Sequence, residues 1–124
     1  MTEVPRLLVT GSRTWTDHEA IRAELSRAWK QLGKHPGTVL VHGACPTGAD
    51  KIADEVWHEW GMPVEPHPAD WGRYGRRAGP IRNTLMVRAG ADHVLAFPVG
   101  HSPGTRGCIR TARQAGLNVQ VIEG

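Results

Sequence analysis

Four short apolar runs, separated by segments with helical periodicity, restrict the fold of this chain more than any other feature. They cover residues Arg6–Thr10, Thr38–His42, His93–Phe97 and Asn118–Ile122, and their Val and Leu content is typical of strands buried on both faces. A fifth run, Met62–Pro66, contains two prolines and is predicted as an edge strand. Strands that alternate with helices form parallel βαβ units with right-handed crossovers. The pattern therefore predicts an α/β fold, a Rossmann-like three-layer α/β/α sandwich with a mainly parallel five-stranded sheet.

The helical segments between these runs are expected to cover both faces of the sheet. The first has a capping-box pattern, Thr16 followed by Glu19, and ends before Gly33. The others are expected over residues 48–60, 80–88 and 105–115. Their large apolar side chains are predicted to face the core: Trp29, Trp57, Trp60, Ile81, Leu85 and Met86.

Length and composition predict a single domain over residues 1–124, since a chain of this size can bury one hydrophobic core. No segment approaches the roughly 18 apolar residues that a membrane span needs. Met1–Arg6 lacks the layout of an export signal, so we expect a cytoplasmic protein with no membrane partner. Cys45 and Cys108 have no CxxC spacing, and neither a metal site nor a required cofactor is expected.

Arginine carries most of the positive charge of the chain. Twelve arginines stand against three lysines, and the net charge is +3. Four of those arginines, with three glycines, fall within residues 71–83. This stretch lacks the apolar periodicity of a strand or an amphipathic helix, so we predict a loop whose guanidinium groups are free to bind an anion.

The loops after the first four strands are the candidate binding site, because ligands of such sheets bind outside the carboxyl ends of the strands. Gly11, Ser12 and Arg13 follow the first strand and can approach a phosphate. The loop after the second strand has the glycine spacing of a Walker A motif. Ala49 and Asp50 stand where that motif needs lysine and a hydroxyl residue, which disfavours NTP hydrolysis by a P-loop mechanism.

Glycine-rich backbone at a helix N-terminus can still bind an anion without the Walker lysine. The loop after the second strand has this composition, with Thr47 as the expected helix cap, and so does the loop after the fourth strand. Asp50 is expected in the first turn of the second helix, where it can also meet ribose hydroxyls. The predicted ligand-binding residues are Gly11, Ser12, Arg13, Gly43, Ala44, Thr47, Gly48, Asp50, Trp71, Arg76, Arg77, Gly79, Arg82, Asn83, Gly104 and Thr105.

The succession of these motifs resembles the YspA-type, YpsA-related branch of the SLOG superfamily. The similarity extends over nearly the whole chain, and its most specific part is the segment Ala69–Asn83. The superfamily includes the DNA-processing protein DprA and the LOG phosphoribohydrolases. The resemblance implies a Rossmann-like fold and the binding of nucleotides or nucleotide-derived ligands.

One departure from the LOG enzymes bears on catalysis. Those enzymes follow their Gly-Thr turn with a glutamate, whereas here Gly104-Thr105 is followed by Arg106. Glycosidic cleavage needs a group that stabilises an oxocarbenium-like centre or activates water. The remaining carboxylates of the loops, Asp50 and Asp70, are the candidate catalytic groups, and whether the protein is an enzyme stays open.

Three functions follow from these features. The leading one is binding of a nucleotide or nucleotide-derived small molecule, as a sensor or binding domain. The second is a nucleosidase or phosphoribohydrolase acting on such a ligand. The third is single-stranded nucleic-acid binding in the manner of DprA, with Trp71 and Tyr74 stacking on bases. A homo-oligomer is also expected, because the helices carry apolar and arginine side chains that would be exposed.

Overall fold

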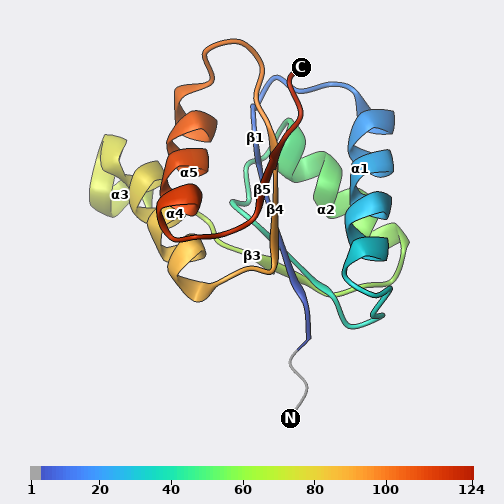
Figure 1. The fold of residues 1–124 in the computed structure, drawn as a ribbon. Coiled ribbons are helices and arrows are strands. Elements are labelled where there is room, and N and C mark those ends of the chain that lie inside the picture. Colours follow the sequence, from blue (N-terminus) through green and yellow to red (C-terminus); the bar gives the residue numbers. More distant parts are fainter. Residues whose placement is uncertain (1–3) are drawn as a thin grey trace.

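The predicted α/β architecture is present in the computed structural model, which describes residues 4–124 (Figure 1). Five parallel strands form one sheet in the order β3-β2-β1-β4-β5. Residues 1–3, part of the segment in which no export signal was found, lie outside the described residues. The strands are β1 (Arg6–Gly11), β2 (Val39–His42), β3 (Val64–Pro66), β4 (His93–Phe97) and β5 (Val119–Val121).

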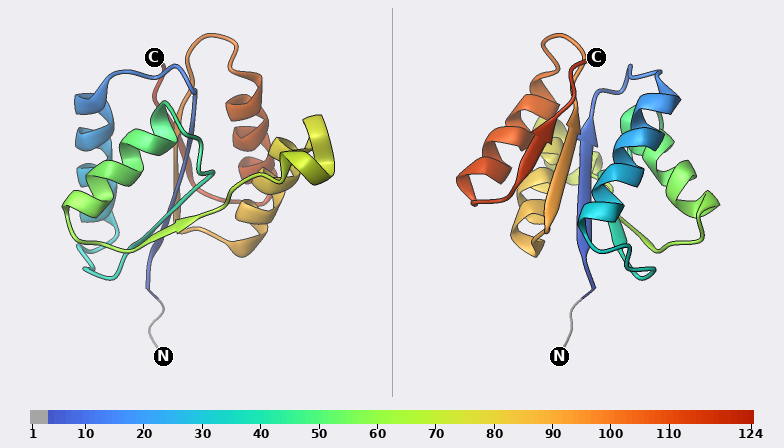
Figure 2. Two further views of the ribbon diagram at one scale, coloured as in Figure 1. Left: turned by 180° about the vertical axis from the view of Figure 1, so that it is seen from behind. Right: turned by 45° about the vertical axis from the view of Figure 1, so that its right-hand side comes forward.

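Helices cover both faces of this sheet, as Figure 2 shows, and this confirms the three-layer sandwich. On one face lie α1 and α2, and on the other lie α4 and α5. A short helix and a 3-10 turn, α3 and η1, lead into α4. The bounds are α1 (His18–Gln31), α2 (Ala49–Glu59), α3 (Trp71–Tyr74), η1 (Gly75–Arg77), α4 (Ala78–Ala89) and α5 (Pro103–Gln114).

Two apolar clusters hold the layers together because the strand side chains alternate between the faces. Leu7, Val9 and Leu95 pack toward α1 and α2, whereas Leu8 and Val94 pack toward α4 and α5. All five are fully buried. The buried apolar character predicted for the runs is confirmed for the centres of β1, β2 and β4, whereas β5, at the edge of the sheet, is only partly buried.

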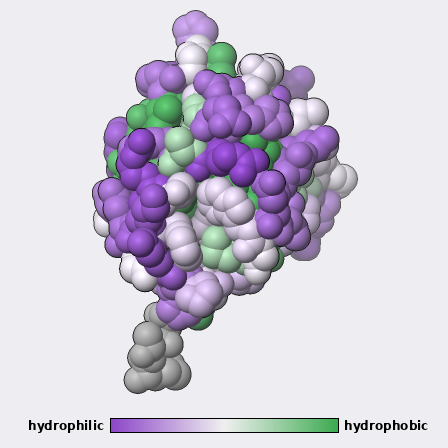
Figure 3. All heavy atoms as spheres, turned by 90° about the vertical axis from the view of Figure 1, so that its right-hand side faces the viewer, coloured by the Kyte–Doolittle hydropathy of each residue, from purple (hydrophilic) through white to green (hydrophobic). Residues whose placement is uncertain are grey.

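The tryptophan predictions for α1 and α2 are confirmed. Trp57 is fully buried, and Trp29 and Trp60 are partly buried against the same cluster. The outer surface over these two helices is mainly hydrophilic, with apolar residues only in small separate patches (Figure 3). Both helices are thus amphipathic. Within residues 4–124 no helix has the length and apolar character needed to cross a membrane.

Two of the predicted helix caps, Thr16 and Thr47, are wrong. The N-cap of α1 is Asp17, whose carboxylate accepts a hydrogen bond from the backbone N–H of Ala20 at 3.0 Å, so the Thr16 capping box does not form. The N-cap of α2 is Gly48 rather than Thr47. The hydroxyl of Thr47 donates instead to the carbonyl oxygen of Arg13 at 3.0 Å, which joins the first two loops.

The arginine-rich stretch is helical, which corrects the prediction of a loop. The carboxylate of Asp70 accepts a hydrogen bond from the backbone N–H of Arg73 at 3.1 Å and caps α3. The chain then runs through η1 into α4, where Ala78 and Gly79 are buried. Because α3 and η1 lie on the surface and bury no residue, they need no apolar periodicity.

The apolar side chains of α4 are only partly placed as expected. Met86 is almost fully buried, but Leu85, predicted to face the core, is 55% exposed. Ile81 is half-buried. The homo-oligomer that would cover such side chains stays a prediction.

The order of the strands defines where a ligand crevice can open. From β1 the chain proceeds to β2 and β3 on one side, then crosses to β4 and β5 on the other. The switch point therefore lies between β1 and β4. There the backbone N–H of Ser12 donates to the carbonyl oxygen of Phe97 at 2.9 Å, which fixes the two strand ends side by side.

Candidate functional site

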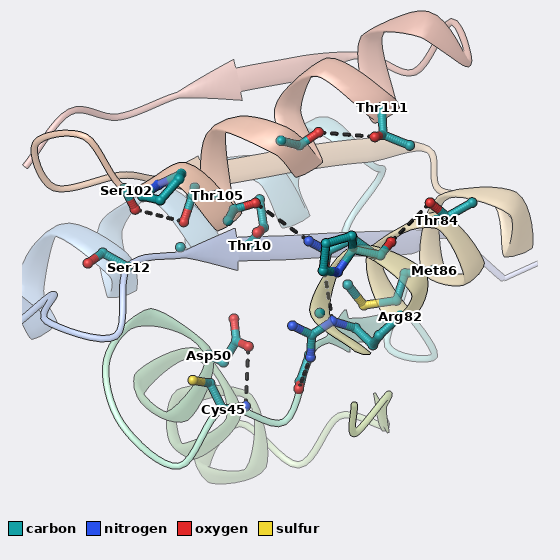
Figure 4. Close-up of a pocket in the computed structure, with 18 of the residues that line it drawn as sticks. Thr10, Ser12, Cys45, Asp50, Arg82, Thr84, Met86, Ser102, Thr105 and Thr111 are labelled. Carbon is teal, nitrogen blue, oxygen red and sulfur yellow. Dashed lines mark hydrogen bonds between the residues drawn. The ribbon is translucent and has the colours of Figure 1, made fainter. Parts of the chain in front are cut away.

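A pocket of about 720 Å³ opens at this switch point, at the carboxyl ends of the strands. Its volume lies in the range typical of small-molecule sites. All four predicted loop regions contribute to its wall, and Figure 4 shows Ser12, Asp50, Arg82 and Thr105 arranged around it. The predicted residues that line it are Gly11, Ser12, Arg13, Gly43, Asp50, Trp71, Arg76, Gly79, Arg82, Asn83, Gly104 and Thr105.

Five other predicted residues do not line the pocket: Ala44, Thr47, Gly48, Asp70 and Arg77. The structure gives several of them another role. Thr47 and Asp70 make the loop and capping contacts described above. The backbone N–H of Ala44 donates to Nδ1 of His42 at 2.9 Å, and Ala44 itself has a positive φ of 57°. The two candidate catalytic carboxylates are therefore separated in role, because only Asp50 faces the pocket.

Two of the glycines are explained by packing between loops rather than by room for a ligand. A Cβ atom on Gly11 would lie 2.4 Å from Cβ of Ala49, so this glycine allows α2 to approach the end of β1. Gly48 has a φ of +78°, and a Cβ there would lie 2.2 Å from the carbonyl oxygen of Ser12. That oxygen accepts a hydrogen bond from the backbone N–H of Ala49 at 3.1 Å. Both glycines hold the first two loops together.

Arg82 crosses the base of the pocket and binds backbone of two strand ends. Its guanidinium donates to the carbonyl oxygen of Gly43, to that of His67 at 3.3 Å, and to Oδ1 of Asn83 at 2.7 Å. A side chain on Gly43 would collide with this group, since a Cβ there would lie 2.7 Å from Cζ of Arg82. The glycine at the end of β2 is thus needed for Arg82 to reach it.

Asp50 is the buried ionisable group of the site. It is only 6% exposed, and its Oδ2 accepts a hydrogen bond from the backbone N–H of Cys45 at 3.3 Å. Its Oδ1 has no hydrogen-bond partner among the described residues. Burial raises the pKa of Asp50 above its usual value, and His42, the backbone hydrogen bond from Cys45 and the charge of Arg82 oppose that effect only in part.

Four arginines line the pocket: Arg13, Arg76, Arg82 and Arg110. Within residues 4–124 none of them forms an ion pair with a carboxylate, whereas Arg6, Arg22, Arg27 and Arg106 do. The guanidinium of Arg13 also lies over the ring of Trp71, 5.5 Å from its centroid. This cation–π contact joins the first loop to α3 and leaves the indole 49% exposed beside the pocket.

The N-terminus of α5 forms the opposite wall. The first backbone N–H groups of a helix have no partner within it and carry partial positive charge. Gly104 has no atom within 4 Å of an added Cβ, so the space in front of it is open. The hydroxyl of Ser102 donates to that of Thr105 at 3.0 Å. Backbone amides and a hydroxyl at such a position suit a phosphate.

Some lining residues were missed by the sequence reasoning. Gly107, Arg110, Thr111 and Gln114 continue the wall along one face of α5. Their spacing of three and four residues is a signal that could have been used. The buried thiol of Cys108 lies on this helix too, and burial raises its pKa, which keeps it protonated rather than nucleophilic. In the described residues no cluster of three or more side chains is suited to a metal ion.

This chain is similar to several known proteins. The model of the family described as "YspA, cpYpsA-related SLOG family" matches residues 5–74. The Gene 61 protein of Mycobacterium phage D29 is 48% identical over 122 residues, which cover 92% of this chain and 93% of that protein. Two crystal structures of the C-terminal domain of a Pyrococcus furiosus hydrogenase are similar at 19% and 18% identity. The two alignments cover 98% of this chain and 94% and 92% of the hydrogenase chains, with TM-scores of 0.46 and 0.47.

Proposed function

Because the chain belongs to the YspA, cpYpsA-related SLOG family, we propose that it binds a nucleotide or nucleotide-derived small molecule at the switch point of its sheet. One observation carries the proposal. Four arginines line a single pocket of about 720 Å³, and none of them has a carboxylate partner among residues 4–124. An anionic ligand supplies the missing negative charge.

The phosphate is best accommodated at the start of α5. There the amides of Gly104 and Thr105 and the open space beside Gly104 can receive its oxygens. Arg76 and Arg110, exposed at the wall of the same pocket, can neutralise it by bidentate hydrogen bonds. The indole of Trp71, held by Arg13, offers a flat surface for the base.

Thermal unfolding with a panel of mono-, di-, cyclic and ADP-ribose-type nucleotides tests this function. A ligand at a hundredfold excess over its Kd should stabilise the fold by about 2.7 kcal/mol. The neighbouring arginines Arg76 and Arg77 form a matched pair, since only Arg76 lines the pocket. Arg76→Gln should reduce the shift and Arg77→Gln should leave it intact. A panel without any shift would remove the proposal.

Hydrolysis of the bound nucleotide is a second candidate function, favoured by one observation. Asp50 is a buried carboxyl group in the pocket with a raised pKa, as a general acid requires. Incubation of the protein with nucleoside monophosphates, followed by chromatography for released base, tests it. Release of base by the wild type but not by Asp50→Asn would establish the reaction, and no release across the panel would reject it.

A further inference from the structure

The unpartnered oxygen of Asp50 points to a specific group on the ligand. Buried polar atoms in native proteins are almost always hydrogen-bonded, so each exception calls for an explanation. In Figure 4 Asp50 turns one carboxyl oxygen toward the backbone of Cys45 and the other toward the space between Ser12 and Arg82. The second oxygen, Oδ1, has no partner in the described residues.

The arginine and histidine side chains near Asp50 are already hydrogen-bonded elsewhere. Arg82 directs its guanidinium to the carbonyl oxygens of Gly43 and His67 and to Asn83. His42 accepts from the backbone N–H of Ala44 through Nδ1, so its other nitrogen, Nε2, donates to Asp54 at 2.6 Å. A donor for Oδ1 therefore has to come from the pocket side.

The open acceptor of Asp50 favours some of the donors that a nucleotide carries over others. Oδ2 already accepts from the backbone N–H of Cys45, so Oδ1 is the oxygen that lacks any donor. An amino group can only donate, whereas a hydroxyl group can donate to a carboxylate or accept from a carboxylic acid. A hydroxyl group thus fits Asp50 in both of its protonation states.

We propose that Asp50 binds the 2′- or 3′-hydroxyl group of the ligand's ribose, so that removal of that hydroxyl group weakens binding. The inference rests on the proposed nucleotide binding and adds the sugar to it. It also orients the ligand, because Asp50 begins α2 while the phosphate lies at the start of α5. The sugar then sits at the base of the pocket and the base reaches outward toward Trp71.

Calorimetric titration of the wild type with AMP, ADP and their 2′-deoxy and 3′-deoxy forms tests this. We expect at least one deoxy form to bind about tenfold or more weakly than its ribonucleotide. Loss of the hydroxyl group that Asp50 binds again leaves Oδ1 without a hydrogen-bond partner. This measurement depends on no variant. Equal affinities for the ribo and deoxy forms would overturn the inference while leaving nucleotide binding intact. If neither AMP nor ADP binds, a nucleotide that shifts the melting temperature in the panel above is compared with its own deoxy forms. If no nucleotide of that panel binds, nucleotide binding fails and the inference falls with it.

Substitution of Asp50 tests whether its carboxylate causes the preference for the ribonucleotide over its deoxy form. In Asp50→Ala the affinity for the ribonucleotide should fall to that of the deoxy form, so that their ratio approaches one. Glu55→Gln is the matched control, because Glu55 is exposed on the same helix, carries the same charge and does not line the pocket. It should keep the wild-type ratio. A folded Asp50→Ala protein that also keeps the wild-type ratio would show that another group reads the sugar and would overturn the assignment.

Discussion

Arg82, on α4, donates a hydrogen bond to the carbonyl oxygen of Gly43 at the end of β2. The same guanidinium reaches the carbonyl oxygen of His67, just beyond β3. One side chain thus connects three segments that are far apart in the sequence and forms the base of the pocket. Its hydrogen-bond donors are used within the protein, so Arg82 contributes positive charge to the pocket, while Arg13, Arg76 and Arg110 can also donate directly to an anion.

Substitution of Arg82 should therefore affect stability as well as binding. Arg82→Gln removes donors from two backbone carbonyl groups, and we expect a loss of about 1–3 kcal/mol in the free energy of unfolding. Arg88→Gln is the matched control, an exposed arginine on the same helix with no ion pair in residues 4–124. Urea denaturation measures both. Similar losses in the two variants would mean that the contacts of Arg82 contribute little.

Two glycines of the pocket should respond in opposite directions to alanine. Gly11→Ala places a Cβ 2.4 Å from Cβ of Ala49 and should cost about 1–3 kcal/mol of stability. Gly104→Ala meets no atom within 4 Å in a helix and should add about 0.4–1 kcal/mol. The new methyl group occupies space at the proposed phosphate position. Nucleotide binding should therefore weaken although the protein becomes more stable. Thermal unfolding with and without nucleotide reports both effects, and undiminished binding by Gly104→Ala would argue against a phosphate there.

The hydrogen bonds of Glu65 with Arg6 predict a pH dependence of stability. They lower the pKa of Glu65 from 4.5 to about 2, with a further contribution from His67. A carboxyl whose folded-state pKa is lowered stabilises the fold above its unfolded pKa and loses that effect as pH falls through the folded value. The stability advantage of the wild type over Glu65→Gln should thus be full at pH 6 and decline between about pH 4.5 and 2. Melting temperatures across this range measure it, and an advantage independent of pH would contradict the assignment.

Asp50 should have the opposite effect on stability. Its folded-state pKa is raised by burial, so its stabilising contribution is present below the unfolded pKa and is lost as pH rises through the folded value. Asp50→Asn removes the buried charge and should melt at a higher temperature than the wild type at pH 8, with a smaller difference near pH 4. A lower melting temperature of the variant at pH 8 would show that the carboxylate stabilises the fold.

The fold was predictable because burial dictates composition. Runs such as Leu7–Val9 are apolar on both sides of the sheet, and only a parallel sheet covered on both faces buries them. The location of the pocket followed from topology, since parallel strands bring their carboxyl ends to one edge. Neither conclusion required knowledge of any single contact.

The roles of individual residues were less predictable, since tertiary contacts decide them. Gly11 and Gly48 were expected to make room for a ligand. The structure shows that they allow close packing, of Gly11 against Ala49 in α2 and of Gly48 against the carbonyl oxygen of Ser12. Nothing local in the sequence distinguishes Arg76, which lines the pocket, from Arg77, which does not. Arg110 was missed because it lies beyond the first turn of α5, whereas the predicted site was limited to the loops and the helix starts.

The position of the ligand is the central claim, and the glycine amides test it most directly. Gly11, Gly43, Gly79 and Gly104 line the pocket, while Gly33, Gly61 and Gly116 follow helices at the opposite edge of the sheet. In a two-dimensional 15N NMR titration with AMP and ADP-ribose, we predict saturable shifts of the first group and little change in the second. Shifts confined to the second group, or no saturable shift with either nucleotide, would contradict the proposed site.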